Sequence, residues 1–267
     1  MLFFTNIFVD DIIRDFSRGH TMASMTFDIS KKRVCDLVTE LPVRGAVFSQ
    51  FGIDFCCGGR ETLSQACEEK DIVLSEVIFE LNKIDSMTMA SETNGLNQMS
   101  ATELCDHIES THHHFLRQHL PTISAHAERV AMVHGEREPH LIEIREIFQE
   151  LRKELEPHLL KEEQILFPLI RTLDESTNLP LVHCGSVKNP IRAMFIEHQS
   201  AGAAIAKLRD LTNSYSPPSH ACNTYRALYG ELALFEKDTH EHIHKENHVL
   251  FVKAQEIERN LIEQNLN

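Results

Sequence analysis

The sequence has no tryptophan, few other aromatic residues, and modest numbers of glycine and proline. The short strands of a β-sandwich or barrel alternate with turns rich in glycine and proline, and they favour aromatic residues. These shortages therefore argue against an all-β fold. Long stretches with helical periodicity dominate instead, and 267 residues are enough for one large domain or for a large and a small one.

Basic residues are also in short supply, since 26 Lys and Arg face 40 Asp and Glu, for a formal net charge of -14. Nucleic acids and anionic membranes bind clusters of Lys and Arg, so neither is expected as a partner. The apolar run from Leu2 to Val9 is too short to span a membrane, lacks the basic flank of a signal peptide, and is followed by Asp10 and Asp11. The seven cysteines are an odd number without a secretory signal, which predicts a reducing compartment, the cytoplasm.

Four segments of different character follow one another along the chain. Residues 1–25 are interpreted as an N-terminal extension, because Met22 and Met25 offer alternative starts. Residues 26–85 predict a small domain of short helices with a glycine-containing turn, FCCGG at 55–59, that holds the thiols of Cys56 and Cys57. Residues 86–99 lack apolar periodicity and are interpreted as a linker. Residues 100–267 contain the long helices.

Capping signals and apolar periodicity predict four long helices. The first begins at the capping box SATE, 100–103, and runs to about residue 131. The second covers about 140–173, with kinks expected at Pro157 and Pro168. Asn189 as N-cap and Pro190 at the first helical position begin the third, and the fourth runs from about Asn223 to near the C-terminus. The expected fold is therefore all-α, with the small helical domain followed by an antiparallel four-helix bundle.

Seventeen histidines are the strongest chemical signal in the chain. Residues at i and i+4 lie on one face of a helix, so His-x-x-x-Glu can present two metal ligands to one site. Two such pairs lie on apolar stripes that should face inward, His158 with Glu162 and His242 with Glu246. His198 lies within the clearest apolar stripe of the chain. These five residues are predicted to point into the bundle.

Other polar residues near these stripes are assigned differently. Periodicity alone does not choose among three consecutive histidines of the first long helix, which are His112, His113 and His114. Three histidines on the opposite side of the last helix are expected to point outward, namely His240, His244 and His248. Glu197, rotated about 100° from its neighbour His198, could support a metal ligand or be merely solvated, and the solvated interpretation is preferred. His107 and His119 are interpreted as structural.

Counting residues around the turns places the candidate histidines at one level. His113 lies 18 residues before Ala131, and His158 lies 18 residues after His140. In an antiparallel pair of helices these two side chains share a height. In the last hairpin, the same count places His198 and His242 at heights that differ by about 9 Å. We attribute this difference to a fourth helix that starts later than Asn223.

The five inward-pointing residues together indicate a metal site, although any one such histidine is as often a half-buried or surface residue. Buried carboxylates without a partner or a metal are costly, so two of them on apolar stripes call for a cation. Imidazole and carboxylate ligands without thiolate suit iron or manganese better than structural zinc. Two carboxylates can also bridge a pair of ions.

Five segments of the chain resemble one known family. In order they are FGIDFCCGGRETL (51–63), THHHFLRQHLP (111–121), HLLKEEQILFP (158–168), IEHQSAG (196–202) and HIHKENHVLF (242–251). They closely resemble motifs of the iron-sulfur cluster repair di-iron proteins, also called the repair-of-iron-centres family, and the resemblance extends from about Phe27 to Phe251. It implies a hemerythrin-like four-helix bundle with two non-haem iron ions, preceded by a small cysteine-bearing domain.

The resemblance also implies a ligand set, in which two glutamates bridge the irons and His113 is selected from the triplet. The implied ligands are His113, His158, Glu162, His198, His242 and Glu246. It further implies a role in restoring clusters damaged by nitric oxide or peroxide, with damaged iron-sulfur proteins as partners. Pro157, directly before a ligand, and the N-terminal extension depart from the family, but neither removes a ligand.

We interpret the di-iron centre as an iron store that supplies damaged clusters. Six protein ligands for two ions leave positions open to water, oxygen or nitric oxide. Cys56 and Cys57 are candidates for contact with a partner cluster or for redox gating. The other cysteines are interpreted as structural, namely Cys35, Cys67, Cys105, Cys184 and Cys222. Two alternatives are a di-iron nitric oxide reductase, which would make the chain an enzyme, and a hemerythrin-type oxygen or nitric oxide sensor. The oligomeric state stays open, with a homodimer as one alternative.

Overall fold

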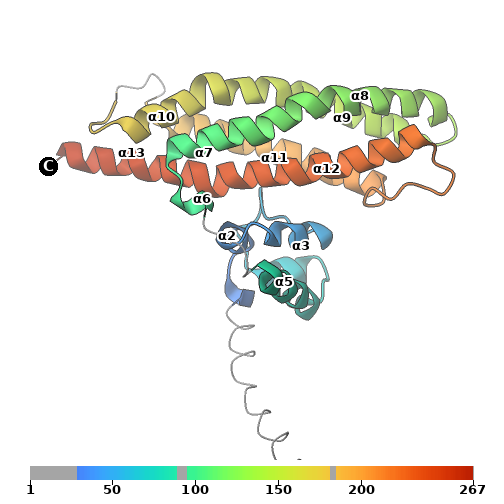
Figure 1. Cartoon of the computed structure of the whole chain (residues 1–267), viewed down its shortest axis with the longest axis horizontal. Helices are drawn as coiled ribbons and strands as arrows, with labels where there is room; N and C mark the ends of the chain where they lie inside the picture. Colours follow the sequence, from blue (N-terminus) through green and yellow to red (C-terminus); the bar gives the residue numbers. More distant parts are fainter. Residues whose placement is uncertain (1–28, 89–94, 181–184, 267) are drawn as a thin grey trace, which may run out of the picture.

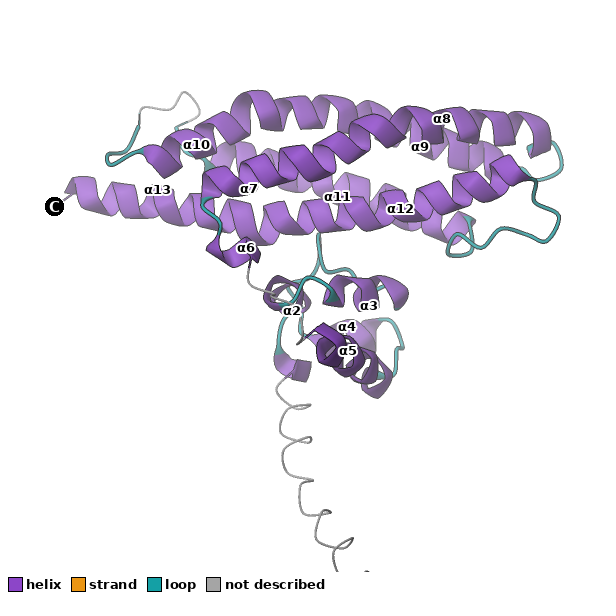
Figure 2. Cartoon of the chain, in the orientation of Figure 1, coloured by secondary structure: helices purple, strands orange, loops and turns teal. Residues whose placement is uncertain are grey.

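The computed structural model describes residues 29–88, 95–180 and 185–266. The interpretations of residues 1–25 and of Cys184 fall outside these ranges. The described residues form helices joined by loops, without a β-strand (Figure 2). An isolated bridge pairs Arg33 with Thr62. The prediction of an all-α fold is confirmed. Among the described helices, none combines the length and the apolar character that a membrane crossing requires.

After a helical turn at residues 29–31, the small N-terminal region contains the helices α2 to α5, which lie beside the bundle in Figure 1. They are α2 Val34–Glu40, α3 Arg44–Gln50, α4 Leu63–Glu69 and α5 Leu74–Thr88. A capping box of Thr62 and Gln65 starts α4. Two described parts of the predicted linker 86–99 are helical, since α5 extends to Thr88 and α6 covers Gly95–Gln98.

Four long rods form the bundle, and three of them contain a π-helical turn, labelled η. Rod one is α7 Ala101–Ile108, η2 Glu109–His113 and α8 His114–His134; rod two is α9 His140–Lys161, η3 Glu162–Leu166 and α10 Phe167–Glu175; rod three is α11 Lys188–Leu211; rod four is α12 Asn223–Lys245, η4 Glu246–Leu250 and α13 Phe251–Leu266. Helix α8 packs against α9 and α12, and α11 packs against α9 and α12, which closes a square of four (Figure 1).

In the second rod, the regular α-helix is not interrupted at Pro157 or Pro168, where kinks were predicted. Helix α9 continues through Pro157 to Lys161, and the irregular turn η3 covers residues 162–166. Pro168 then occupies the first turn of α10, where a missing N–H costs little. The second rod therefore changes its hydrogen-bond pattern between the two prolines, at Glu162. Such single π-turns within α-helices are frequent at functional sites.

The helix starts predicted at the Ser100 capping box, at His140 and at Asn223 are confirmed, whereas the start predicted at Pro190 is wrong. Ser100 and Glu103 form the expected capping box at the start of α7. Helix α12 does start at Asn223, so a later start is wrong, and the loop 212–222 joins helix ends that are not level. Helix α11 starts at Lys188 rather than at Pro190, and its N-cap, Val187, has no capping side chain of its own.

The start of α11 is capped from another helix. A carboxylate oxygen of Glu258, in α13, accepts a hydrogen bond from the backbone N–H of Val187 at 2.7 Å, and its other oxygen accepts one from the hydroxyl of Ser186 at 2.7 Å. Glu258 is buried. A long-range contact therefore supplies the cap that the sequence predicted for Asn189.

Two apolar clusters fill the described part of the molecule. One contains residues of the small domain together with residues of the rods between Leu116 and Leu159 and between Ala201 and Ile243. The other fills the opposite end, around Ala101–Ile108, Leu166–Leu173 and Val249–Leu261. On every rod the predicted ligands fall between the two clusters, so a polar layer crosses the bundle at this level.

Candidate metal centre

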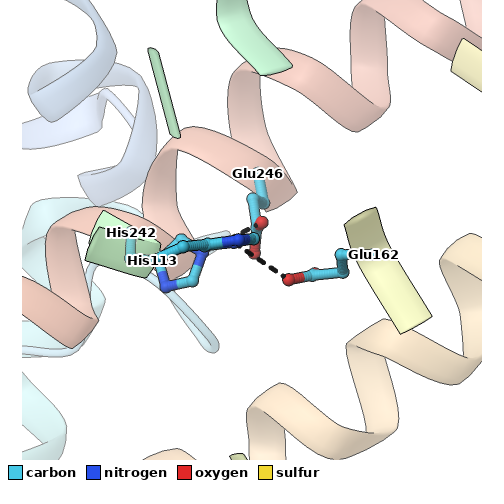
Figure 3. A group of neighbouring side chains, drawn as sticks. All are labelled: His113, Glu162, His242 and Glu246. Carbon is cyan, nitrogen blue, oxygen red and sulfur yellow. Dashed lines mark hydrogen bonds and ion pairs between the residues drawn. The ribbon is translucent and has the colours of Figure 1, made fainter. Parts of the chain in front are cut away.

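All six predicted ligands meet in the polar layer of the bundle. Each comes from a different turn of the four rods, and each side chain is almost fully buried. They form two groups, each with candidate ligand atoms within 4.8 Å of one another. The His113 group consists of His113, Glu162, His242 and Glu246, as drawn in Figure 3, and the His198 group consists of His158, Glu162, His198 and Glu246.

The two glutamates belong to both groups, which is the arrangement that bridging requires. Glu162 places one oxygen 3.4 Å from Nε2 of His113 and the other 3.3 Å from Nε2 of His158. Glu246 places one oxygen 3.1 Å from Nε2 of His242 and the other 3.1 Å from Nε2 of His198. Each carboxylate therefore faces one imidazole of each group.

The polar atoms of this layer fit a pair of cations. Within the described residues, Nε2 of His113, both oxygens of Glu162 and one oxygen of Glu246 are buried without a hydrogen-bond partner. Burial opposes ionisation of Glu246, but the imidazoles of His242 and His198 outweigh it and hold the pKa of Glu246 well below its usual value. Buried carboxylates without compensation are strongly destabilising, whereas two cations would satisfy the unpartnered atoms.

Carboxylates outside the groups orient two of the imidazoles. Glu163 accepts a hydrogen bond from Nδ1 of His113 at 2.7 Å and pairs with Arg117 at 2.6 Å. Because Nδ1 carries the proton, Nε2 of His113 keeps a lone pair for a metal. Sequence reasoning missed Glu163, although its place one residue after Glu162 is a signal that could have been used.

The second orienting carboxylate is Glu197, and its interpretation as solvated is wrong. It accepts a hydrogen bond from Nδ1 of His158 at 2.8 Å, and its other oxygen pairs with Lys161 at 2.5 Å. The residue lies on α11, one position before His198, but its partner lies on α9. Helical phase within α11 alone could not reveal this partner.

The histidine triplet separates into three environments. His113 points into the polar layer, while His114 is exposed. His112 is also buried, but its Nδ1 lies 2.9 Å from a carboxylate oxygen of Asp238, outside both groups. The last positions of the π-turn η2 thus place adjacent histidines in different surroundings, which a regular 3.6-residue period does not describe.

The outward assignment of three histidines on α12 and η4 is wrong. His244 is buried, and its Nδ1 lies 3.2 Å from the carbonyl oxygen of Phe55. The ring of Phe55 also packs edge-on against His240. Nε2 of His248 lies 2.9 Å from the carbonyl oxygen of Cys56. This face of rod four therefore contacts the small domain rather than solvent.

The turn with Cys56 and Cys57 lies directly against the metal layer. The two sulfurs are 3.6 Å apart, and the six cysteines in the described residues are free thiols. The thiol of Cys57 donates to the backbone carbonyl of His198 at 3.3 Å. The hydrogen bond with Cys57, burial and the charge of Asp54 raise the pKa of Cys56 well above its usual value. A role of the two thiols in cluster contact or redox gating stays a prediction.

The other cysteines that the structure describes differ in burial, and their structural role stays a prediction. Cys35, Cys67 and Cys105 are buried, whereas Cys222 is exposed at the start of α12. His107, interpreted as structural, lies 3.1 Å from the ammonium group of Lys245.

Comparisons with known proteins divide the chain in two. Residues 30–85 match the model of a domain of unknown function, DUF542, and residues 106–254 match the hemerythrin HHE cation binding domain. The second match covers all six predicted ligands. Hemerythrin domains of this type bind non-haem iron, and the buried His and Glu groups fit a non-haem di-iron site.

Full-length relatives lead to the same family. The chain is 31% identical to the iron-sulfur cluster repair protein ScdA of Staphylococcus haemolyticus, over 82% of this chain and 96% of the relative. It is 32% identical to a probable iron-sulfur cluster repair protein of Haemophilus influenzae, over 84% and 97%. It is 34% identical to the iron-sulfur cluster repair protein YtfE of Dickeya chrysanthemi, over 82% and 94%. With the fold, the two buried groups and these matches in agreement, the chain belongs to the family of iron-sulfur cluster repair proteins.

Proposed function

We propose that this protein repairs iron-sulfur clusters damaged by nitrosative or oxidative stress, and that it does so by supplying iron. The observation that carries the proposal is the buried layer of four imidazoles and two carboxylates, in a chain whose relatives are named iron-sulfur cluster repair proteins. In this proposal two irons are held by the six side chains that meet in that layer, with the glutamates shared: His113, His158, Glu162, His198, His242 and Glu246.

Iron is the cargo in this scheme. A damaged cluster lacks iron, and its sulfide and cysteine ligands are softer than the imidazoles and carboxylates that surround the store, so Fe(II) can transfer to them. Glu163 and Glu197 orient the imidazoles of His113 and His158 so that Nε2 of each ring points inward, where it can bind iron. The partners are therefore damaged iron-sulfur proteins. A reducing compartment such as the cytoplasm suits the free thiols of the six cysteines in the described residues, and a homodimer stays a prediction.

Transfer of labelled iron tests the proposal. The full chain loaded with ⁵⁷Fe is mixed with a purified iron-sulfur dehydratase that nitric oxide has inactivated. We expect the dehydratase to regain activity and to acquire the ⁵⁷Fe Mössbauer signal of its cluster. The Glu246→Gln variant should lose iron and reactivate nothing, whereas Glu256→Gln, at an exposed position of α13, should act like the parent.

Two results would count against the proposal. Failure of the loaded parent to reactivate the dehydratase contradicts repair by iron supply. Retention of two antiferromagnetically coupled irons in the Glu246→Gln variant contradicts the shared-glutamate assignment.

One observation favours the nitric oxide reductase as a second candidate. A narrow cavity of about 10 Å³ lies beside the layer and is lined by His158, His198 and His242. This is room for about one water-sized molecule, which suits a diatomic ligand such as nitric oxide or oxygen. The reaction would consume two nitric oxide molecules, two electrons from a supplied reductant and two protons, and would release nitrous oxide and water. Many turnovers per centre with excess nitric oxide and reductant would favour the enzyme, and at most one would favour the iron store.

A further inference from the structure

The imidazoles of the metal centre are not all held in the same way. Carboxylates that pair with surface cations hold the rings of His113 and His158. His198 is held by Asn247 instead, whose amide oxygen accepts a hydrogen bond from Nδ1 at 2.9 Å. Because an amide oxygen only accepts, this bond leaves Nε2 of His198 free for a metal. Asn247 lies next to the shared ligand Glu246, within the π-turn η4.

The other end of the Asn247 amide reaches the small domain. Its nitrogen donates a hydrogen bond to the carbonyl oxygen of Cys56 at 3.1 Å. A carbonyl can only accept, so exchanging the two ends of the amide would lose the bond to Cys56. Asn247 is only 3% exposed, and a bond lost here is not cheaply replaced by water. One side chain therefore joins the cysteine turn to a predicted iron ligand.

The cysteine turn is anchored on one side and faces a cavity on another. The carboxylate of Asp54 accepts hydrogen bonds from the backbone N–H groups of Cys56, Cys57 and Gly58. Cys56 and Cys57 are among the residues that line a cavity of about 440 Å³ between the small domain and α11. Toward α11 the sulfur of Cys57 is in close contact, because a Cβ added at Gly202 would come within 3.1 Å of it. A group attached to Cys57 therefore has no room toward α11 and must displace the turn or enter the cavity.

We propose that Asn247 is a positioning residue that couples the Cys56–Cys57 turn to the metal of the His198 group. When the turn is displaced, Asn247 loses its contact with the carbonyl of Cys56 and holds His198 less firmly. The metal of the His198 group then leaves before the metal of the His113 group. This inference rests on the proposed iron-supplying function, and it specifies which iron is supplied and which contact controls its release.

The test measures release of Fe(II) from the reduced, iron-loaded full chain to a ferrous chelator. A Cys222→Ser background removes the exposed thiol of α12. Methyl methanethiosulfonate then modifies Cys57, whose thiolate forms an S–S bond to the methylthio group while methanesulfinate leaves and the thiol proton passes to solvent. We expect two kinetic phases, one for each iron, and acceleration of only one phase by about tenfold after modification. A Cys57→Ser variant should show no such response.

Two variants of Asn247 separate coupling from general damage to the fold. Asn247→Ala removes both contacts, so the same phase should be fast without modification, and the Mössbauer doublet of one iron should change. Asn247→Asp keeps an acceptor for Nδ1 of His198 but cannot donate to the carbonyl of Cys56, so the same phase should be faster than in the parent before modification and insensitive to modification. Glu163→Gln is the matched control in the other group, and it should accelerate the other phase while the response to modification persists.

The proposal is overturned if Asn247→Ala accelerates both phases equally, or if either Asn247 variant responds to modification as the parent does. If the alanine variant does not fold, the aspartate variant alone decides. The release assay contains no client protein. A chain that releases iron as expected but does not restore a damaged cluster would therefore contradict the proposed function and leave the coupling intact.

Discussion

At the scale of single residues, metal binding depends on the side chains that orient the ligands as well as on the ligands themselves. Glu197 is next to His198 in sequence, but it orients His158 on another helix and is balanced by Lys161. An imidazole without such a partner can rotate or carry its proton on the wrong nitrogen, and either change weakens a metal bond. The carboxylate is partly exposed, so its effect should appear in metal affinity more than in the stability of the fold.

Replacing Glu197 by alanine should therefore weaken iron binding on the order of tenfold, which is the usual effect of losing an orienting carboxylate. Competition with a ferrous chelator at equilibrium measures the change. Glu150→Ala provides the control, because Glu150 is exposed on the same helix as His158 and pairs with Lys153. Equal iron affinity of the two variants would show that Glu197 does not support the ligand.

At the scale of helices, the rods are completed by contacts between them. Glu258 of α13 caps the start of α11, and Asp174 of α10 accepts a hydrogen bond from the backbone N–H of Thr102 at the start of α7. The first N–H groups of a helix lack partners within the helix, and acceptors near this end are stabilising. The two helix starts near one end of the bundle are thus tied to the neighbouring rods.

Replacing Glu258 by alanine should lower the free energy of unfolding by about 1–3 kcal/mol, because the buried N–H of Val187 and the hydroxyl of Ser186 lose their acceptor. Urea denaturation measures the change. Glu256→Ala, two residues earlier and exposed, should change stability by less than about 0.5 kcal/mol. If the two variants are equally stable, the cap across helices contributes nothing measurable.

At the scale of the whole molecule, the polar layer divides the bundle while the small domain extends one of its halves. The apolar cluster that contains Phe48 and Phe55 of the small domain also contains Phe148 and Phe235 of the rods. The opposite cluster lies beyond the candidate ligands. Both clusters therefore meet the centre, and removal of its metal leaves buried carboxylates in the middle of the fold.

Removal of iron should lower the melting temperature. A ligand present at about 100 times its Kd stabilises the folded state by about 2.7 kcal/mol, which corresponds to roughly 5–10 °C for a chain of this size. Anaerobic calorimetry of the iron-loaded and iron-free forms measures the difference. A double variant, Glu162→Gln with Glu246→Gln, should lose the iron-dependent increase. Identical melting of the loaded and iron-free parent would contradict an iron site in the core.

Local features of the sequence determined the helical character of the chain and five inward-pointing candidate ligands. The pairs His158–Glu162 and His242–Glu246 could be predicted because each begins in regular α-helix and ends at the first residue of its π-turn, so the ordinary i, i+4 geometry still applies. His113 lies at the end of a π-turn, where helical phase fails, and only the resemblance to a family selected it.

Tertiary structure decided what depends on distant parts of the chain. The three histidines predicted to face outward from rod four contact the small domain, Glu197 finds its imidazole on another rod, and α11 takes its cap from α13. The bridge from Cys56 through Asn247 to His198 joins residues far apart in sequence. Periodicity reports the face of a helix on which a side chain lies, but the partner on that face is set by packing between elements.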